Sequence, residues 1–339
     1  MKAIAKTRPG PGVELIEVPV PRPGPNELLV KVAVCGICGS DLHIYLWELN
    51  ADRVVSKFPT VIGHEPAGEV VEVGAGVADF KVGDHVALDP FGPCGTCPAC
   101  QHGRFNFCHN PGRLGGSFAE FAIAPTRNAW VVPKAMKLEQ AAMLEPFATG
   151  VHAIEESSLK AGDSCVIEGP GPIGLCTALA ARALGVTSIV ITGLAIDAER
   201  LALSRAMGFK TVCATDRDWT EHVRALMPPD GADVVFDAAG FLDSVRQLVR
   251  RNGEVVELGW PARDIPNSEM RSLFFHGVKI IPSRVRVPST WRRSIAMVAS
   301  GAVDLMPMVT HRYGLDRGVE AFELLNRKQG VKALILPQE

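Results

Sequence analysis

From about Asp163 onward, short apolar segments alternate with stretches whose hydrophobic residues recur at helical spacing. The series runs SCVIEG, PIGLCTALAARALG, SIVIT, DAERLALSRAMG, ADVVFDAAG, FLDSVRQLVRRNG and GEVVELG. Such alternation is typical of βαβ units, in which right-handed helical crossovers join the strands of a parallel sheet. This part of the chain is therefore predicted to be an α/β domain with a doubly wound parallel sheet.

A glycine-rich turn, GPGPIG at residues 169–174, lies between the first of these strands and the first helix. In that setting Gly169 would make the tight turn, Gly171 would let a pyrophosphate approach the backbone, and Gly174 would allow the helix to pack closely on the strand. The helix N-terminus adds unpaired N–H groups and a positive dipole. We therefore predict a dinucleotide site of the Rossmann type, with an ordinary glycine turn as the alternative. Its predicted cofactor-binding residues are Gly169, Gly171, Pro172, Ile173 and Gly174.

The choice between NAD and NADP depends on the end of the second strand. An NAD site usually has an acidic residue ~20 positions after the glycine motif, to hold the ribose 2′-hydroxyl. Here that place is Gly193, and the nearest carboxylate, Asp197, could equally be the N-cap of the next helix. A 2′-phosphate would meet no repulsion there, and Arg200 or Arg205 could pair with it. The sequence therefore allows either NAD or NADP as the cofactor. Gly193→Asp is expected to shift the preference toward NAD.

Four cysteines, Cys94, Cys97, Cys100 and Cys108, follow the pattern C-x2-C-x2-C-x7-C. Four thiolates at this spacing match a closed tetrahedral zinc site, with the flanking Gly and Pro making tight turns. An iron–sulfur cluster could use similar ligands, and four free thiols are the simplest alternative. The β-rich surroundings favour structural zinc. The chain has nine cysteines and no sign of secretion, so metal ligation explains this cluster better than disulfides.

The remaining patterns divide the 339-residue chain, which is too long for one core by default. The first part reads as short strands between turns: ELLVKVAV, GEVVEVG, DHVAL and SFAEFAIA. Two helical patterns and a last strand, TWRRSIAMVASG, DRGVEAFELLNRKQG and KALILP, are expected to return to this first domain. We predict a β-rich domain at 1–148, the dinucleotide domain at 149–287, and the returning segment at 288–339.

Composition and charge argue against several kinds of partner. The formal net charge is −2 and no segment concentrates Lys and Arg, so nucleic acid is not expected as a partner, whether for the whole chain or for the cysteine cluster. The start MKAIAKTRPGPG lacks the apolar stretch of a signal peptide. Apolar runs such as GLCTALA end at charges well before the ~20 residues needed to cross a bilayer. A cytoplasmic protein without a membrane partner is expected.

Three further segments contain residue types suited to a second metal site: Cys38 in CGICGSDLH, His64 with Glu65 in VIGHEPAG, and Glu145 in MLEPFATG. Each also has an ordinary structural interpretation. A cysteine beside glycines is usually a small core residue, a histidine is usually just hydrogen-bonded, and Glu145 could cap a helix. Their spacing alone does not join them.

Taken together, these segments resemble the zinc-containing medium-chain dehydrogenase/reductase family, near its sorbitol (polyol) and threonine dehydrogenase branches. The resemblance covers nearly the whole chain and implies a GroES-like catalytic domain that carries the four-cysteine zinc lobe. The matching stretches, in the family's order, are CGICGSDLHIY, GHEPAGEVVEVG, GDHVALDP, PCGTCPACQHGRFNFC, GSFAEF, LEPFATGVHA, GPGPIG and VTHRYGLD.

The resemblance implies two zinc ions per chain. Cys38 and His64 would bind the catalytic ion, and Glu145 falls where plain alcohol dehydrogenases have a second cysteine but polyol-type enzymes have glutamate. Glu65 would lie beside the metal as an outer or exchanging ligand. Water or the substrate oxygen would take the open position.

The reaction that the resemblance implies is transfer of a hydride between a secondary alcohol and NAD(P), with the zinc ion lowering the pKa of the hydroxyl. Ser40 and His43 match the family's proton-relay positions, although Ser40 could only bond the turn and His43 could lie on the surface. A catalytically silent zinc-bearing binding or structural protein of the same fold is the alternative. The presence of an open-site ligand set together with a dinucleotide motif favours the enzyme.

Different segments of the chain resemble different branches of the family, so the resemblance does not select one substrate class. The lobe from LDPFGPCG to GRFNFC is closer to the polyol branch, whereas HIYLWELNADR has the length of the threonine branch. The expected substrate is a polyol, a sugar-derived alcohol or a hydroxy acid, with a threonine-type amino alcohol as the second possibility. The strand VKIIPSR and the habits of the family suggest a homodimer or homotetramer.

Overall fold

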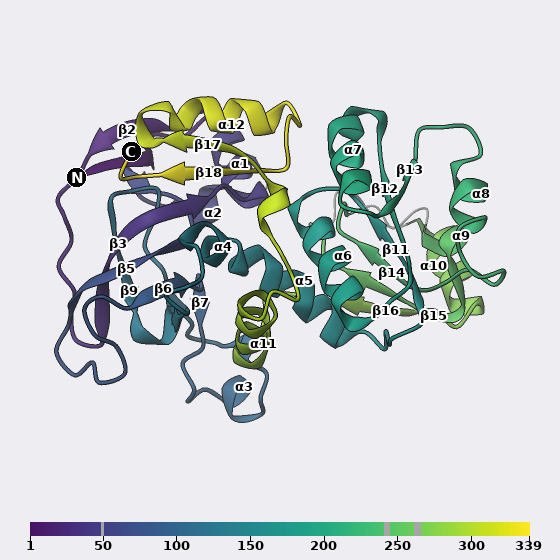
Figure 1. The fold of residues 1–339 in the computed structure, drawn as a ribbon, viewed down its shortest axis with the longest axis horizontal. Coiled ribbons are helices and arrows are strands. Elements are labelled where there is room, and N and C mark those ends of the chain that lie inside the picture. Colours follow the sequence, from purple (N-terminus) through teal and green to yellow (C-terminus); the bar gives the residue numbers. More distant parts are fainter. Residues whose placement is uncertain (49–50, 241–244, 261–265) are drawn as a thin grey trace. The chain divides into compact units, whose positions relative to one another are not determined.

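The structure is a computed structural model that describes residues 1–48, 51–240, 245–260 and 266–339. The chain divides into two compact units (Figure 1). Unit 1 consists of Met1–Glu145 and Val287–Glu339, and unit 2 consists of Pro146–Arg286. Unit 1 is therefore built from two stretches that are far apart in the sequence.

Unit 1 is rich in strands. Its strands are β1 (Lys2–Lys6), β2 (Glu14–Glu17), β3 (Glu27–Gly36), β4 (Thr60–Val61), β5 (Glu65–Val73), β6 (His85–Leu88), β7 (Phe91–Gly92), β8 (Gly112–Arg113), β9 (Phe121–Pro125), β10 (Ala129–Val131), β17 (Val309–Gly314) and β18 (Lys332–Leu336). Its helices are α1 (Gly39–Leu46), α2 (Ala51–Val54), α3 (Pro98–Gln101), α4 (Leu138–Ala142), α11 (Pro288–Ala299) and α12 (Gly318–Asn326), and α5 (Leu144–Glu156) begins in this unit.

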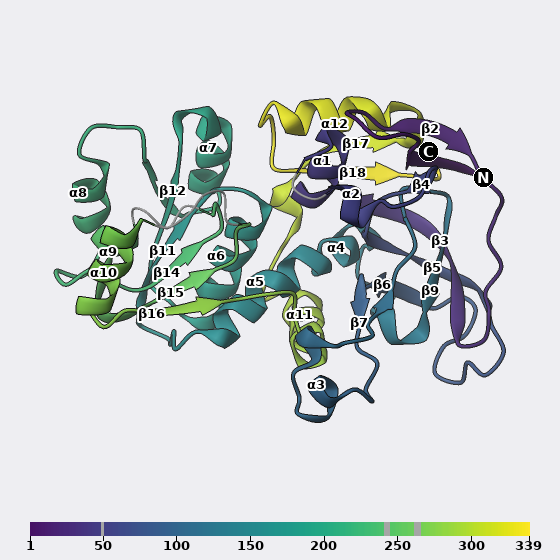
Figure 2. The ribbon, with the colours of Figure 1, turned by 180° about the vertical axis from the view of Figure 1, so that it is seen from behind.

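The main sheet of unit 1 has the order β10-β6-β5-β3-β18-β17, and β9 also pairs with β3. The last strand of the chain, β18, lies antiparallel to β3, so the C-terminal segment joins the same sheet as strands from the first part of the chain. Helix α12 lies along β17 and β18 in both views (Figures 1 and 2). Its buried Phe322 and Leu325 join a core that includes Ile37 and Phe118.

Unit 2 contains a single sheet among its described residues. Its strands are β11 (Ser164–Glu168), β12 (Ser188–Gly193), β13 (Lys210–Cys213), β14 (Ala232–Asp237), β15 (Val249–Glu257) and β16 (Lys279–Pro282). After α5, its helices are α6 (Pro172–Leu184), α7 (Ala198–Ala206), α8 (Trp219–Arg224), α9 (Val245–Leu248) and α10 (Asn267–Phe275). Among the helices of the described residues, none is long and apolar enough to cross a membrane.

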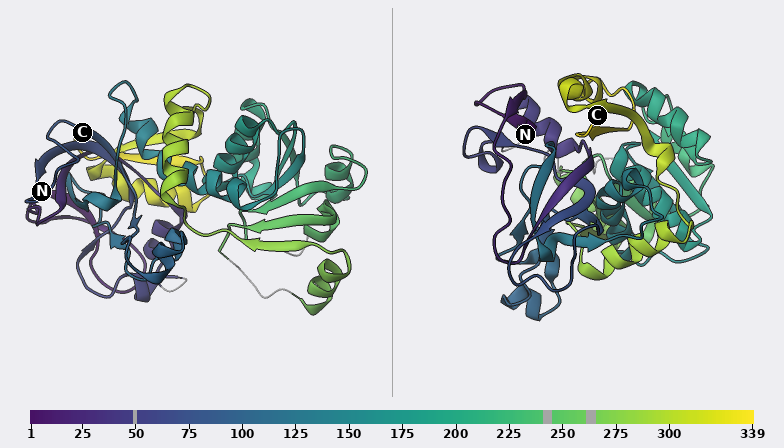
Figure 3. Two further views of the ribbon diagram at one scale, coloured as in Figure 1. Left: turned by 90° about the horizontal axis from the view of Figure 1, so that it is seen from below. Right: turned by 60° about the vertical axis from the view of Figure 1, so that its left-hand side comes forward.

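The sheet of unit 2 has the order β13-β12-β11-β14-β15-β16, and every pairing is parallel. All five residues of β11 are buried, as expected for a central strand covered on both faces. One face packs against α8, α9 and α10 through Val166, Val235 and Val255. The helices that follow β11 and β12 lie on the opposite side from α10 (Figure 3). The predicted doubly wound parallel sheet is confirmed.

The helical stretch predicted at FLDSVRQLVRRNG is wrong in its second half. Residues 241–244 lie outside the described residues, and α9 spans only Val245–Leu248. Strand β15 already begins at Val249, which pairs with Ala232 before a register shift leads to the pairing of Glu254 with Val234. Pairing with β14 therefore overrides the helical spacing, and β-branched Val249 is suited to the strand.

Candidate active site and metal centres

Two neighbouring strands of the main sheet bring the predicted catalytic residues together. Strand β3 ends at Gly36 and β5 begins at Glu65, and these two residues are partners in the antiparallel register. The chain that leaves β3 and the chain that enters β5 therefore meet at one edge. As a result, one ligating atom each of Cys38, His64 and Glu65 lie within 4.8 Å of one another.

Asp41 contacts both Cys38 and His64, and it holds the loop that carries Cys38 as well as the imidazole. Cys38 is the N-cap of α1, so the first helical turn carries Asp41 back over it. Asp41 is 1% exposed; its Oδ2 accepts a hydrogen bond of 3.0 Å from the backbone N–H of Cys38, and its Oδ1 lies 3.2 Å from Nδ1 of His64. Since Nδ1 faces the carboxylate, Nε2 is the nitrogen left for a metal.

The electrostatics of His64 reflect the same contacts. Burial alone would lower the pKa of His64, but the charge and close contact of the Asp41 carboxylate and the nearby Cys38 together hold this pKa well above its usual value. The aspartate thus stabilises positive charge at the imidazole. A bound cation at this point would benefit from the same carboxylate.

Glu65 is completely buried and is paired with a lysine from the other end of the chain. Nζ of Lys332 lies 2.7 Å from one oxygen of Glu65 and 2.9 Å from the other, and it also donates to the carbonyl of Ile37 at 3.0 Å. A Cβ at Gly36 would overlap the carboxylate. Lys332 is not among the site residues predicted from the sequence, although a lysine that opens the apolar strand KALIL was a signal for a buried charge.

The structure does not place Glu145 with the other three predicted ligands. Its side chain is buried, at 7% exposure, in the first turn of α5. Its carboxylate is absent from the group of ligating atoms that Cys38, His64 and Glu65 form, so it is not within 4.8 Å of all three.

Ser40 and His43 lie one turn apart on α1, which places them on the same face of the helix. Ser40 is exposed, and the Nδ1 atom of His43 is buried without a hydrogen-bond partner in the described part of the chain. Burial is the main cause that lowers the pKa of His43; Glu48 opposes this shift and Lys328 adds to it. The imidazole is therefore neutral at neutral pH and can accept a proton.

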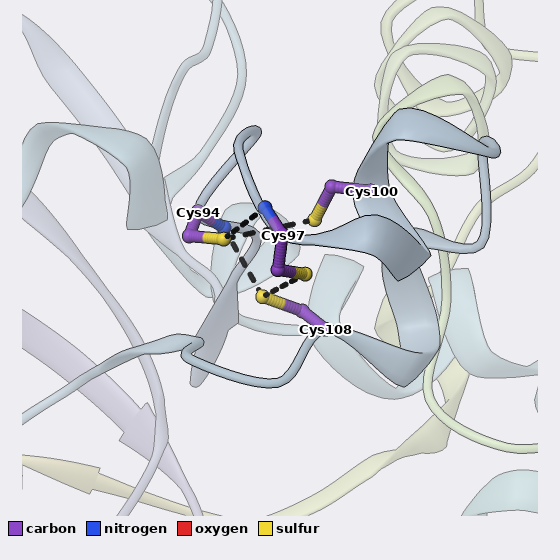
Figure 4. Close-up of side chains that lie close together, drawn as sticks. All are labelled: Cys94, Cys97, Cys100 and Cys108. Carbon is purple, nitrogen blue, oxygen red and sulfur yellow. Dashed lines mark hydrogen bonds between the residues drawn. The ribbon is translucent and has the colours of Figure 1, made fainter.

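The four cysteines of the lobe form the second cluster, with their sulfur atoms directed at a common centre (Figure 4). Sγ of Cys94 lies 4.0 Å from Sγ of Cys100, and Sγ of Cys97 lies 3.9 Å from Sγ of Cys108. A zinc tetrahedron with Zn–S bonds of ~2.3 Å has edges of about 3.8 Å. The residues present therefore fit one zinc ion with four sulfur ligands.

Backbone N–H groups prepare these sulfur atoms to carry negative charge. Sγ of Cys94 accepts from the N–H of Cys97 at 3.3 Å, and Sγ of Cys108 accepts from the N–H of Cys94 at 3.2 Å. The N–H groups of Thr96 and Cys97 are the largest causes that lower the pKa of Cys94 to about 5, whereas burial raises that of Cys100 to about 12. A dication at the centre would offset that cost at Cys100.

The glycine turn of unit 2 has the geometry that its sequence requires. Gly169 has φ of +103°, a conformation that side chains rarely adopt, and a Cβ at Gly174 would overlap the carbonyl oxygen of Gly169. Gly171 is the N-cap of α6, and a Cβ there would point into open space. Pro172 opens the helix, so the backbone N–H groups of its first turn are available to an anion.

The end of β12, where the sequence leaves the cofactor choice open, has little space for a side chain. A Cβ at Gly193 would lie 2.8 Å from the ring carbons of Pro170, so Gly193→Asp would push against the glycine turn as well as add a charge. Asp197 accepts from the N–H of Leu194 at 3.2 Å and lies 3.7 Å from Arg200, which is 9% exposed. This carboxylate and this arginine therefore interact with each other.

Comparisons with known proteins agree with this geometry. Residues 24–134 match the alcohol dehydrogenase GroES-like domain, and residues 172–300 match the zinc-binding dehydrogenase family. The L-threonine 3-dehydrogenase of Thermococcus kodakarensis is 36% identical over 349 residues, covering 100% of this chain and 99% of the relative. The sorbitol dehydrogenase of Halalkalibacterium halodurans is 33% identical over 347 residues, covering 99% of each.

A solved structure agrees as well. The zinc-binding dehydrogenase of Sinorhizobium meliloti 1021, bound to NADP, superposes with a TM-score of 0.87 at 33% identity and covers 99% of both chains. The predicted enzyme class is confirmed: the chain is a zinc-dependent NAD(P) oxidoreductase that acts on alcohols. With two family models matched and full-length relatives above 30% identity, the chain belongs to the zinc-containing medium-chain dehydrogenase/reductase family.

Proposed function

We propose that this enzyme oxidises a secondary alcohol at a zinc ion held by Cys38, His64 and Glu145. The observation that supports this most is the convergence of Cys38 and His64 at the β3–β5 edge, with Asp41 orienting the imidazole. A thiolate, an imidazole and a carboxylate are donors that zinc accepts in open catalytic sites. Because both oxygens of Glu65 contact Lys332, we assign the third protein ligand to Glu145.

When bound, zinc would supply a Lewis acid for the alcohol hydroxyl, and the nicotinamide would supply the hydride acceptor or donor. The residues of the chain orient and support them. Asp41 contacts both the backbone N–H of Cys38 and the ring of His64, so one carboxylate orients both ligands. This arrangement reduces the reorganisation that metal binding requires.

The proton released from the alcohol leaves, in this proposal, through Ser40 and His43. The exposed hydroxyl of Ser40 and the half-buried imidazole of His43 occupy one face of α1. Since burial keeps His43 neutral, its unpartnered Nδ1 can receive a proton and pass it outward.

For the cofactor, we propose that the pyrophosphate binds the N-terminus of α6 through the turn formed by Gly169, Gly171 and Gly174, with Pro172 and Ile173 opening the helix. Gly193 leaves the end of β12 without the carboxylate that favours NAD. The solved relative from Sinorhizobium meliloti carries NADP. We therefore propose that NADP is accepted as well as NAD, with Arg200 beside the adenosine ribose.

For the substrate, we propose a polyol, a sugar-derived alcohol or a hydroxy acid. The similarity to a sorbitol dehydrogenase and, at 34% identity over 346 residues, to the D-arabitol-phosphate dehydrogenase of Enterococcus avium supports this class. A threonine-type amino alcohol is the second candidate, supported by the 36% identity to L-threonine 3-dehydrogenase.

The test is a panel of polyols, sugar acids and hydroxy amino acids, assayed with NAD and with NADP before and after chelation of metal. We expect turnover of one class and its loss on chelation. Glu145→Gln should lose the catalytic metal, whereas Glu65→Gln should retain it. Turnover that survives complete removal of the catalytic metal would contradict the proposal, and retention of that metal by Glu145→Gln would contradict the ligand assignment.

We also propose a homodimer or homotetramer in the cytoplasm. Strand β16 is an edge of its sheet, and the neighbouring helix α10 exposes Phe274 at 77% and Phe275 at 74%. An edge strand beside exposed aromatic residues is suited to pairing with a second copy. Light scattering should give a multiple of the chain mass that falls in Phe275→Glu, and cell fractionation would test the location.

A further inference from the structure

We propose that Lys332 is a positioning residue: it holds Glu65 away from the catalytic metal and thereby keeps one coordination position available to the alcohol. This inference rests on the proposed function, since it concerns the metal bound by Cys38 and His64. It assigns a role in the reaction to a residue far from both ligands in the sequence.

The ammonium of Lys332 donates hydrogen bonds to three oxygen atoms. Two are directed to the two oxygens of Glu65, at 2.7 and 2.9 Å, and one is directed to the carbonyl of Ile37, at 3.0 Å. Both side chains are buried, with exposures of 1% and 0%. The ammonium thus forms an ion pair with the carboxylate of Glu65 and also donates a hydrogen bond to the residue that precedes Cys38.

Glu65 is close enough to become a ligand. One of its oxygens already lies within 4.8 Å of the ligating atoms of Cys38 and His64. A buried carboxylate requires a partner of positive charge. Here two cations can meet that need, the ammonium of Lys332 and the metal ion, and the ammonium is the one in contact with both oxygens.

Removal of the ammonium should change which cation the carboxylate of Glu65 contacts. Without Lys332 the carboxylate of Glu65 has the metal as its remaining cation, and ligation by it would close the site in the manner of a structural centre. The enzyme would then hold its metal more firmly but offer the alcohol no position. Lys332 therefore keeps a carboxylate close to the ion without allowing it to act as a permanent ligand.

The test uses holoenzyme in which the catalytic ion has been exchanged for Co²⁺ while the lobe retains zinc. Lys332→Met should alter the ligand-field spectrum of the cobalt and slow its loss to a chelator by about tenfold, with kcat lowered by about tenfold or more. The double variant Lys332→Met/Glu65→Gln should restore the wild-type spectrum, because the amide has no charge to bring to the metal. Lys332→Arg should also keep that spectrum.

A matched control is available in Lys6, a second fully buried lysine in the described part of unit 1. It is 1% exposed, and its Nζ donates to backbone carbonyls, including that of Gly12 at 2.8 Å. Lys6→Met should lower stability but leave the cobalt spectrum unchanged. If Lys332→Met does not accumulate as folded protein, Lys332→Gln provides the comparison, since it keeps a donor toward Glu65 without the charge.

The outcomes separate this inference from the proposed function. A wild-type cobalt spectrum in Lys332→Met, or a double variant that keeps the altered spectrum, would overturn the role of Lys332 while the function stands. Failure of the wild-type enzyme to bind metal through Cys38 and His64 would overturn both.

Discussion

The two metal centres of unit 1 are built in opposite ways. The lobe takes its four sulfur ligands from one stretch, Cys94 to Cys108, and its supporting hydrogen bonds come largely from backbone N–H groups of the same stretch. The proposed catalytic site takes Cys38 from the chain that follows β3 and His64 from the chain that precedes β5, and it is supported by the side chains of Asp41 and Lys332. A closed site can thus form within one loop, whereas an open site needs rigid support from the fold.

This difference has a physical reason. Four thiolates complete the coordination of zinc, so a short flexible segment can wrap around the ion and be held by it. A site that leaves one position for substrate cannot rely on the ion to hold its own ligands in place. It therefore depends on the β3–β5 register and on buried charges around the ligands.

The largest expected effect is the loss of activity when a ligand of the catalytic metal is removed while the lobe is left intact. Cys38→Ala should lower kcat/KM by at least about 10³-fold, because the Lewis acid contributes several kcal/mol to the transition state. Metal analysis should show loss of one equivalent per chain, with the lobe still loaded. A Cys38→Ala enzyme with near-normal turnover would show that the two centres have been assigned the wrong roles.

The next effect concerns the proton relay that we propose for Ser40 and His43 in the catalytic region. His43→Asn should lower kcat/KM for alcohol oxidation by about 10²-fold. In the wild-type enzyme the rate should fall as the pH drops through the pKa of His43, which burial holds below its usual value, because protonated His43 cannot accept a proton. The pH profile of kcat/KM measures this. In His43→Asn the fall of kcat/KM at low pH should disappear. If kcat/KM still falls at low pH in this variant, another group causes the fall.

A smaller effect should follow from Asp41→Asn, which keeps the shape of the side chain but removes its charge. Metal affinity at the catalytic site should weaken about tenfold, as is common for carboxylates that orient metal-binding histidines. Titration with a competing chelator measures the affinity, and the lobe provides an internal reference. Equal loss from both centres would mean that Asp41 supports the whole unit rather than His64.

The smallest effect on the reaction is expected in the lobe itself. Cys97→Ser should lose the lobe metal and lower the Tm by at least about 5 °C, since each kcal/mol lost moves the Tm by ~2–4 °C in a domain of 150–250 residues. The kcat of the folded fraction should stay close to that of wild type. Calorimetry and initial rates measure the two quantities, and a loss of kcat as large as that in Cys38→Ala would remove the distinction between the centres.

Patterns confined to one segment can be interpreted from the amino-acid sequence alone. The strand–glycine–helix order around GPGPIG predicts a doubly wound sheet, and Gly169 and Gly174 have the backbone geometry that this motif demands. The cysteine spacing likewise predicts a cluster, and its sulfur atoms are separated by about the edge length of a zinc tetrahedron. In both cases the interacting atoms are close in sequence, so spacing alone specifies their geometry.

Long-range contacts are predictable only in part. The register between β14 and β15 makes a strand of Val249, although its segment has helical spacing. The space available at Gly193 depends on Pro170, and Arg200 is already in contact with Asp197. Neither contact is encoded in the local pattern, so the sequence did not show that Gly193→Asp would also push against Pro170.

The sequence by itself determined the fold class, the local turn for a dinucleotide and the cysteine lobe, because each depends on periodicity or spacing within a short stretch. The family resemblance, and no spacing rule, joined Cys38, His64 and Glu65, which the structure brings together. The tertiary structure alone decided that Asp41 contacts the imidazole and that Lys332 pairs with Glu65. Residues 267 positions apart can form a 2.7 Å ion pair only through the pairing of strands, and no spacing rule encodes that contact.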